Sequence, residues 1–323
     1  MSVLRSKYFK VLFPSSLLLL VALGVLEFSP VLNSQAEAPV PVKPVENVVQ
    51  KQPVREISPE ASLRLIALGD PGSGVKQQYD MAAQMTAYYD QHPFKAALVL
   101  GDNIYPDGDV DNLGELRFNK PYRPLREERH IPFIVALGNH DIVRGNIPKQ
   151  LKFYQMPNRY YSKTLNDNGM GLEVFVLDTN TFANDKAQIA WLDKALGESK
   201  AYWKIVTGHH PIYSSGLHGN NSGLIKTLKP LLEKHRVPLY LAGHDHNYER
   251  FAPVNGVTYL ISGGAGAYLR PMKIQKPGSL RKESVFHFMA IEATPAQLHL
   301  DAINRDGKTF DKFDIRTSVT SSQ

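Results

Sequence analysis

The stretch "LIALGDPGSGVK" at residues 65–76 joins an apolar run to a glycine-rich turn. A phosphate-binding P-loop has a Lys followed by Ser or Thr directly after its last glycine, so that an amine and a hydroxyl reach phosphate and magnesium together. Here Val75 follows the last glycine, and Gln77 follows the lysine. The nucleotide interpretation is therefore weak, and the feature that needs an explanation is Asp70, which stands where the apolar run ends.

Apolar runs of the same kind recur along the chain. They are "KAALVLGDN", "IPFIVALGNHD", "LEVFVLDTN", "WKIVTGHH", "VPLYLAGHDH" and "VTYLISGGAG". All but the last end in residues rich in Asp, Asn or His, and helical patterns lie between several of them, at 77–91, 186–197 and 222–235. Strands that alternate with helices predict a largely parallel sheet covered on both faces, with ligands bound beyond the carboxyl ends of the strands. The final runs, "FHFMAIEA", "QLHLDAIN" and "KFDI", lack intervening helices and predict an antiparallel end to the sheet.

Composition narrows the possible chemistry. A chain of 323 residues with 43% hydrophobic side chains can bury the core of one large domain or two small ones. Without cysteine there is no disulfide, thiolate site, cysteine nucleophile or lipid-modified cysteine, so any metal must be held by oxygen and imidazole. The net charge is +6, but basic residues are dispersed, and "RPLREERH" at 123–130 mixes both signs. This distribution favours a solvated surface over nucleic-acid binding.

The N-terminus has the layout of a secretory signal. Three basic residues within the first ten precede an uncharged, largely apolar stretch at 11–26. We expect residues 1–36 to form a signal peptide cut after Ala36, because the next small-residue site would place Pro39 directly after the cut. The apolar stretch lies at the lower limit of spanning length, so an uncleaved anchor is the alternative, and only then would the chain contact a membrane. Either arrangement predicts a secreted or extracytoplasmic protein.

Residues 37–61 are rich in proline and show neither a helical nor a strand period. Such a composition predicts an extended linker. The folded domain is therefore expected at residues 62–318.

Polar clusters follow five of the expected strands. They are Asp70; Asp102, Asn103 and Tyr105; Asn139, His140 and Asp141; His209 and His210; and His244, Asp245 and His246. Each cluster alone has a simpler explanation, as a turn, a helix cap or a packed side chain. Together, at the carboxyl ends of successive strands, they are expected to converge in one crevice. Carboxylate, amide, phenol and imidazole donors without a thiol suit iron, manganese and zinc.

The pair His244 and His246 is the most informative local signal. Two imidazoles two residues apart beyond a strand can each face a different ion, and a carboxylate such as Asp102 can bridge the ions because it has two oxygens. Two ions about 3.5–4 Å apart stabilise the attacking and leaving oxygens of an in-line phosphoryl displacement. The pattern therefore indicates phosphoester chemistry.

Taken as a set, these motifs closely resemble the purple acid phosphatases of the small, mammalian-like type, within the calcineurin-like metallophosphoesterases. The matching motifs, within residues 63–265, are "DPG" from Asp70, "GDNIY" from Gly101, "GNHD" from Gly138, "GH" from Gly208 and "GHDH" from Gly243. Two features separate them from the wider superfamily: Gly72 stands where a histidine usually does, and Tyr105 becomes a ligand. The resemblance implies an α/β fold, a metallophosphoesterase-type layered β-sheet sandwich flanked by helices, in a single catalytic domain.

The resemblance also implies the metal ligands. It implies an iron(III) site made by Asp70, Asp102, Tyr105 and His246. It implies a second site, for divalent iron, zinc or manganese, made by Asp102, Asn139, His209 and His244. This division agrees with donor chemistry, because phenolate and carboxylates are hard anionic oxygens that stabilise a trivalent ion, whereas an amide and imidazoles are neutral.

The implied activity is hydrolysis of phosphate monoesters by metal-hydroxide attack, with an acidic optimum and with small monoesters or phosphopeptides as substrates. His140 and His218 are the residues expected to contact phosphate or protonate the leaving group. His218 lies in the loop "YSSGLHGNNSG", which has a second interpretation as a flexible lid whose histidine is incidental. Spacing alone does not choose between His209 and His210 as a ligand, and the resemblance favours His209.

Two other functions stay open at the level of sequence. A phosphodiesterase on the same scaffold differs mainly in the surrounding loops, which the motifs do not define. The other is a surface protein that binds metal or phosphate without catalysing a reaction, although the complete set of predicted ligands argues against it. Asp245 and Tyr248 are expected to support the site rather than to bind metal.

Overall fold

The computed structural model describes residues 57–272 and 275–316. The predicted signal segment at 1–36 and most of the predicted linker lie outside these ranges. Ile57 already packs against the hydrophobic core, so the last residues before the expected boundary at 62 contact the domain. Within the described ranges, no helix has the length and apolar character needed to cross a membrane.

The described residues form two mixed β-sheets. The first has the order β13-β12-β11-β1-β2-β3 and the second the order β10-β8-β9-β7-β6-β5-β4. The strands of the first sheet are β1 (Leu63–Leu68), β2 (Ala96–Val99), β3 (Phe133–Val135), β11 (His287–Ala293), β12 (Gln297–Asn304) and β13 (Thr309–Arg316). Those of the second are β4 (Tyr161–Asp167), β5 (Met170–Val176), β6 (Trp203–Thr207), β7 (Leu239–Ala242), β8 (Tyr248–Phe251), β9 (Thr258–Ser262) and β10 (Ser279–Glu283).

The helices lie along the chain between these strands. They are α1 (Lys76–Gln91), α2 (Val110–Gly114), α3 (Lys120–Arg123), α4 (Ile147–Tyr154), α5 (Lys186–Glu198), α6 (Ser222–Thr227) and α7 (Lys229–Lys234). Shorter helical turns are η1 (Glu115–Asn119), η2 (Pro124–Glu128), η3 (His140–Ile142) and η4 (Phe182–Asn184). The pattern at 222–235 divides into α6 and α7 because Pro230, near the start of α7, has no N–H to continue the preceding helix.

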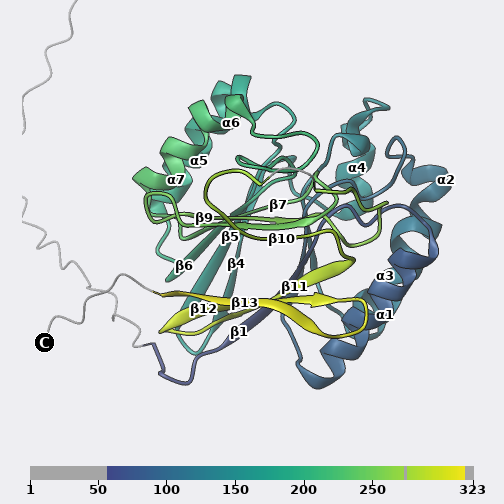
Figure 1. The fold of residues 1–323 in the computed structure, drawn as a ribbon, viewed down its shortest axis with the longest axis horizontal. Helices are drawn as coiled ribbons and strands as arrows, with labels where there is room; N and C mark the ends of the chain where they lie inside the picture. Colours follow the sequence, from purple (N-terminus) through teal and green to yellow (C-terminus); the bar gives the residue numbers. More distant parts are fainter. Residues whose placement is uncertain (1–56, 273–274, 317–323) are drawn as a thin grey trace, which may run out of the picture. The chain divides into compact units, whose positions relative to one another are not determined.

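The two sheets pack face to face, and helices cover their outer faces. Alternate residues of β1 divide between two cores: Leu65 faces the other sheet, whereas Ile66 packs with Met81 and Met85 of α1. A third core joins the second sheet to α5, α6 and α7. In Figure 1 these three helices lie on one side of the strands and α1 and α3 on the other.

The predicted layered β-sandwich is confirmed. The prediction of a single, largely parallel sheet is wrong, because the strands form two mixed sheets. The apolar runs are strands as expected, but those up to β3 belong to the first sheet and those from β5 to β9 to the second. An apolar run indicates a strand buried on both faces, and burial by a second sheet leaves the same pattern as burial by helices. The antiparallel end is confirmed, because β11 pairs antiparallel with both β1 and β12.

Parallel pairing sets the position of the polar clusters. β1, β2 and β3 run parallel in the first sheet, and β6 and β7 run parallel in the second. The carboxyl ends of parallel strands lie at one edge of a sheet. The loops after these five strands carry every predicted metal ligand, so the fold brings the ligands together where the two sheets meet.

Candidate metal centre

Three of the predicted ligands have an unusual backbone conformation. The φ angles of Asp70, Asp102 and His244 are 57°, 55° and 71°. Positive φ is uncommon for residues other than glycine, and such strain persists where the surrounding structure enforces it, often at functional sites. At Asp70 the turn is held by its own N–H, which donates to the carbonyl of Gly101 at 3.1 Å. The strand ends therefore turn sharply and direct these side chains inward.

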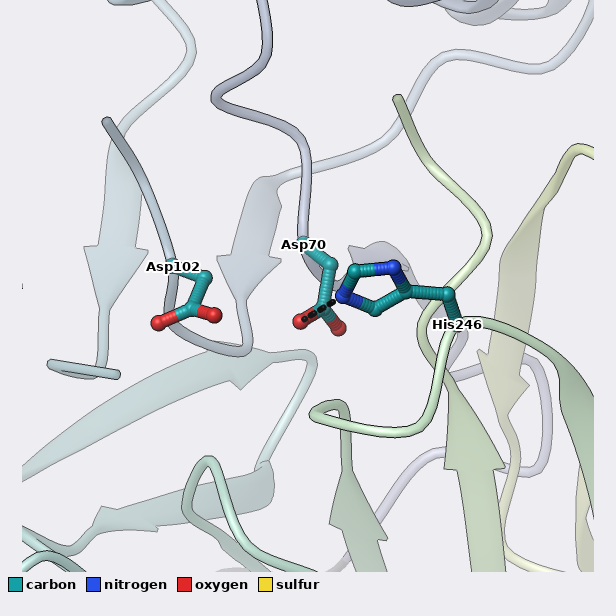
Figure 2. A group of neighbouring side chains, drawn as sticks. All are labelled: Asp70, Asp102 and His246. Carbon is teal, nitrogen blue, oxygen red and sulfur yellow. Dashed lines mark ion pairs between the residues drawn. The ribbon is translucent and has the colours of Figure 1, made fainter. Parts of the chain in front are cut away.

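The first group of donors consists of Asp70, Tyr105 and His246. The Tyr105 hydroxyl lies 3.2 Å from Asp70 Oδ1 and 3.0 Å from His246 Nε2. His246 Nε2 lies 3.5 Å from Asp70 Oδ1. Figure 2 shows Asp70 and His246 pointing toward each other with Asp102 beside them, and donor atoms of these three residues lie within 4.8 Å of one another.

The second group consists of Asn139, His209 and His244. His209 Nε2 lies 3.0 Å from Asn139 Oδ1 and 3.1 Å from His244 Nδ1. Asp102 Oδ1 lies 3.4 Å from the same His209 nitrogen. Asp102 thus stands at the junction of the two groups, as the expected bridging ligand would, while the role of each residue as a ligand stays a prediction.

Backbone carbonyls orient two of the imidazoles. His209 Nδ1 lies 2.9 Å from the carbonyl of Leu100, and His246 Nδ1 lies 2.8 Å from the carbonyl of Tyr268. Since a carbonyl only accepts hydrogen bonds, each Nδ1 carries a proton, and Nε2 is the atom of each ring that faces the centre. This is the arrangement in which histidine binds metal.

The buried carboxylates need positive charge. Burial lowers the pKa of His209, but the charge of Asp102 and its hydrogen bond outweigh this effect and raise that pKa to about 10. Burial also raises the pKa of Asp70 well above its usual range; His209 opposes the rise and Asp102 adds to it. A metal ion fits this donor set because it supplies the missing charge.

The remaining donors are also suited to a cation. Burial and the neighbouring charge of His209 lower the pKa of His244, and burial lowers the pKa of His246, so both imidazoles are neutral and have lone pairs to donate. Burial and the carboxylates of Asp70 and Asp102 raise the pKa of Tyr105 well above its ordinary value. The phenol therefore becomes a phenolate only when a cation binds beside it.

Close backbone packing explains the glycine in the first motif. A Cβ atom on Gly72 would lie 2.1 Å from the carbonyl oxygen of Asn103. Any side chain at this position, including the histidine that the resemblance sets against Gly72, would require the loop carrying Tyr105 to move. The two departures from the superfamily pattern are thus linked through one backbone contact.

Both predicted catalytic histidines lie beside the donor groups and are partly exposed. His140 Nε2 lies 3.9 Å from Asp102 Oδ2, and 35% of its side chain is accessible. The ring of His218 lies 3.9 Å from that of His244, centroid to centroid. His218 Nδ1 lies 2.8 Å from Asp245 Oδ1, so the carboxylate holds the ring over the centre.

The structure distinguishes His209 from His210. His210 Nδ1 lies 2.9 Å from the hydroxyl of Thr179, away from the carboxylates, and its ring lies 4.4 Å from that of His244. Burial and the nearby charge of His209 lower the pKa of His210 to about 3. His209 is the one that contacts Asn139 and Asp102, in agreement with the resemblance.

Asp141 is a supporting residue whose role the sequence does not reveal. Its buried carboxylate accepts from the backbone N–H groups of Asn103 at 2.9 Å and Gly138 at 2.8 Å, so it joins the loops after β2 and β3. Burial and the charge of Asp102 raise the pKa of Asp141 to about 7. The sequence feature that could have indicated this role is the position of Asp141 directly after the motif "GNH". Tyr248, expected to be structural, is buried in β8 and donates to Asp311 at 2.6 Å.

The fold and these donor groups define a metallophosphoesterase. Residues 63–248 match the family described as Calcineurin-like phosphoesterase, and the chain belongs to that family. It is similar to tartrate-resistant acid phosphatase type 5 of Sus scrofa, at 29% identity over 299 residues that cover 79% of this chain and 87% of the relative. It is also similar to purple acid phosphatase 4 of Arabidopsis thaliana, at 27% identity covering 82% and 86%.

Solved structures show the same fold. A purple acid phosphatase from yellow lupin seeds, PPD1, matches with a TM-score of 0.68 and 21% identity over 81% of this chain and 54% of that one. GAP50, described as the anchor in the inner membrane complex of Plasmodium, matches with a TM-score of 0.73 and 22% identity over 81% and 91%. At these identities the likeness concerns the fold and does not extend to activity.

Proposed function

We propose that this protein is a binuclear acid phosphatase of the purple acid phosphatase type, which hydrolyses phosphate monoesters. The observation that carries the proposal is the convergence of two donor groups on the shared carboxylate of Asp102. The similarity to acid phosphatases over most of the chain supports the same activity.

Asp70, Tyr105 and His246 would hold iron(III), and Asn139, His209 and His244 would hold a divalent iron, zinc or manganese ion. Bound together with Asp102, the two ions would lower the pKa of a water molecule and stabilise the charge that develops during phosphoryl transfer. The anionic oxygens gathered around Tyr105 favour the trivalent ion at that position.

The proton for the leaving group would come from histidine. His218 donates its Nδ1 hydrogen to Asp245, so Nε2 is the atom that holds and releases a proton at the mouth of the site. His140 directs Nδ1 toward the carbonyl of Pro106 and is likewise left with Nε2 facing the centre. Either imidazole must be protonated to act as an acid, which is consistent with activity at acidic pH.

The substrates proposed are small phosphate monoesters and phosphopeptides. A diester presents the same phosphate oxygens to the centre, so the donor groups alone do not reject it. Hydrolysis of p-nitrophenyl phosphate should exceed that of bis(p-nitrophenyl) phosphate, and a strong preference for the diester would contradict the monoester assignment.

The decisive experiment combines a visible spectrum, metal analysis and p-nitrophenyl phosphate hydrolysis on one sample of purified protein. A violet tyrosinate band, close to two metals per chain and turnover in the acid range are expected. A colourless, active protein with manganese or zinc would retain the phosphoesterase and contradict iron(III). Protein that stays inactive from pH 4 to 8 after reconstitution with iron and zinc would instead support an idle binding protein.

Export is the remaining part of the proposal. Residues 1–36 would direct the chain out of the cytoplasm and be removed after Ala36. Mass spectrometry of the N-terminus of the exported protein should find Glu37 first, whereas retention of residues 11–26 in a membrane fraction would indicate an uncleaved anchor.

A further inference from the structure

A cavity of about 920 Å³ opens between the edges of the two sheets, away from the metal centre. β3 is the last strand of the first sheet and β4 the last strand of the second. Residues of β3, β4, η1, η2 and α4 line the cavity, which we call the β3–β4 cavity. Its lining in the described part of the chain includes none of the predicted metal ligands and neither His140 nor His218.

The cavity contains an arginine without an acidic partner. Arg126 donates to Asn119 Oδ1 at 2.7 Å and lies over the rings of Phe118 and Phe133, at 4.9 and 5.7 Å from their centroids. Within the described part of the chain, no carboxylate oxygen lies within 4 Å of the Arg126 guanidinium. Burial lowers its pKa, and the more distant carboxylates of Glu127 and Glu115 oppose part of this shift. A half-buried guanidinium of this kind favours an anion from outside the chain.

The neighbouring arginines of the same segment differ from Arg126. Arg123 pairs with Glu115 at 2.5 Å and with Glu127 at 3.4 Å. Arg129 pairs with Asp90 at 2.8 Å. Glu127, the acid that lines the cavity, pairs with Arg123, so among the described residues Arg126 has no carboxylate in direct contact and is influenced by Glu127 and Glu115 only at longer range.

A second donor lies beside Arg126. The hydroxyl of Tyr154 is buried and has no hydrogen-bond partner among the described residues, although the side chain lines the cavity. The Tyr154 ring lies 4.7 Å from that of Phe118, the same ring over which Arg126 lies. A buried hydroxyl without a partner is unfavourable, so an acceptor that reached it from the cavity would be bound more tightly.

We propose that the β3–β4 cavity binds an organic carboxylate that has an aromatic or other apolar body. The carboxylate would accept from Arg126 and Tyr154, and the body would pack on the partly exposed rings of Phe133 and Phe153. One guanidinium and one neutral hydroxyl suit a monoanion better than a phosphate dianion, which needs more positive charge. Lys163 also lines the cavity and adds a positive charge beside the negative charge of Glu127.

The test uses 4-fluorophenylacetate as the probe and fluorine NMR of the purified full-length protein as the readout. We expect saturable binding, weakened about tenfold or more in Arg126→Gln and about threefold or more in Tyr154→Phe, because the first change removes a charged donor and the second a neutral one. The neutral analogue 4-fluorophenylacetamide should bind more weakly than the carboxylate.

Matched controls separate this cavity from other cationic sites. Arg129→Gln removes an arginine of the same segment that pairs with Asp90 and does not line the cavity, and it should leave the affinity unchanged, as should Asp70→Asn at the metal centre. Absence of saturable binding at millimolar probe, equal weakening by the two arginine variants, or loss of binding in Asp70→Asn would each overturn the proposal. If Arg126→Gln does not fold, an unchanged affinity in Tyr154→Phe would overturn it as well.

Discussion

At the scale of single residues, Asp102 is the side chain on which the site depends. It is buried, it turns with a positive φ, and its carboxylate lies between the two donor groups. His140 reinforces its position by donating a backbone N–H to Asp102 Oδ1 at 2.9 Å. If Asp102 binds both ions, its replacement should lower the metal content more than replacement of a residue that binds one ion.

This difference gives the first prediction. Asp102→Asn should reduce the metal content from near two ions per chain to near none, and Asp70→Asn should mainly remove the ion beside Tyr105. Metal analysis together with the visible band distinguishes these outcomes. His140→Ala serves as the control, because it should retain both ions while hydrolysis slows by about a hundredfold or more. Equal metal loss in all three variants would contradict the division of roles.

Asp245 allows a second prediction at this scale. Asn in place of Asp245 should lower kcat by about 10- to 100-fold with little change in metal content, because the carboxylate orients His218 without touching the donor groups. The alkaline limb of the pH profile should also move, because a proton donor is needed in its protonated form and the negative charge beside the imidazole is lost. A change confined to thermal stability would indicate that Asp245 is only structural.

At the scale of elements, β11 carries a buried histidine that should make the fold sensitive to acid. His287 is fully buried, with Nε2 lying 3.0 Å from the hydroxyl of Ser262 and Nδ1 lying 2.9 Å from the carbonyl of Val285. Burial lowers its pKa from 6.5 to about 4. The folded protein therefore keeps this imidazole neutral at pH values where the unfolded chain protonates it.

The sign of the pH effect follows from linkage. Between about pH 6.5 and 4 the unfolded state binds more protons at His287, so the free energy of unfolding should fall as the pH falls, by up to about 1.4 kcal/mol per pH unit. Above pH 6.5 this group should contribute no slope. Denaturant unfolding at constant metal content, compared between the wild type and His287→Gln, tests this: the variant should lose part of the slope, and an identical slope would exclude His287 as the cause.

At the scale of the whole molecule, the predicted metal ligands come from both sheets. Asp70, Asp102 and Asn139 follow strands of the first sheet, whereas the three predicted histidine ligands follow strands of the second. Side chains also link the sheets far from the centre, as where Trp203 Nε1 donates to the carbonyl of Thr294 at 2.8 Å. Bound ions would add a second connection at the opposite end of the strands.

Removal of metal should therefore lower the stability of the whole domain. Ligands bound at a thousand times their dissociation constant stabilise the folded state by about 4 kcal/mol, which for a domain of this size corresponds to a shift in Tm on the order of 10 °C. Calorimetry before and after chelation measures the shift, and readdition of metal should reverse it. Asp102→Asn is the control, since its Tm should not respond to chelator. A wild-type Tm that chelation leaves unchanged would contradict the role of the ions in joining the sheets.

The sequence by itself determined the features that depend on local pattern and side-chain chemistry. Apolar runs such as 65–68 identified the strands, and the polar residues after them identified the donor set, because the carboxyl ends of parallel strands collect at one edge. The tertiary structure decided which sheet each strand joins, because burial by a sheet and burial by helices leave the same pattern. It also placed His209 rather than His210 beside Asp102, and it left Arg126 without an acid, since both depend on contacts between segments far apart in the chain.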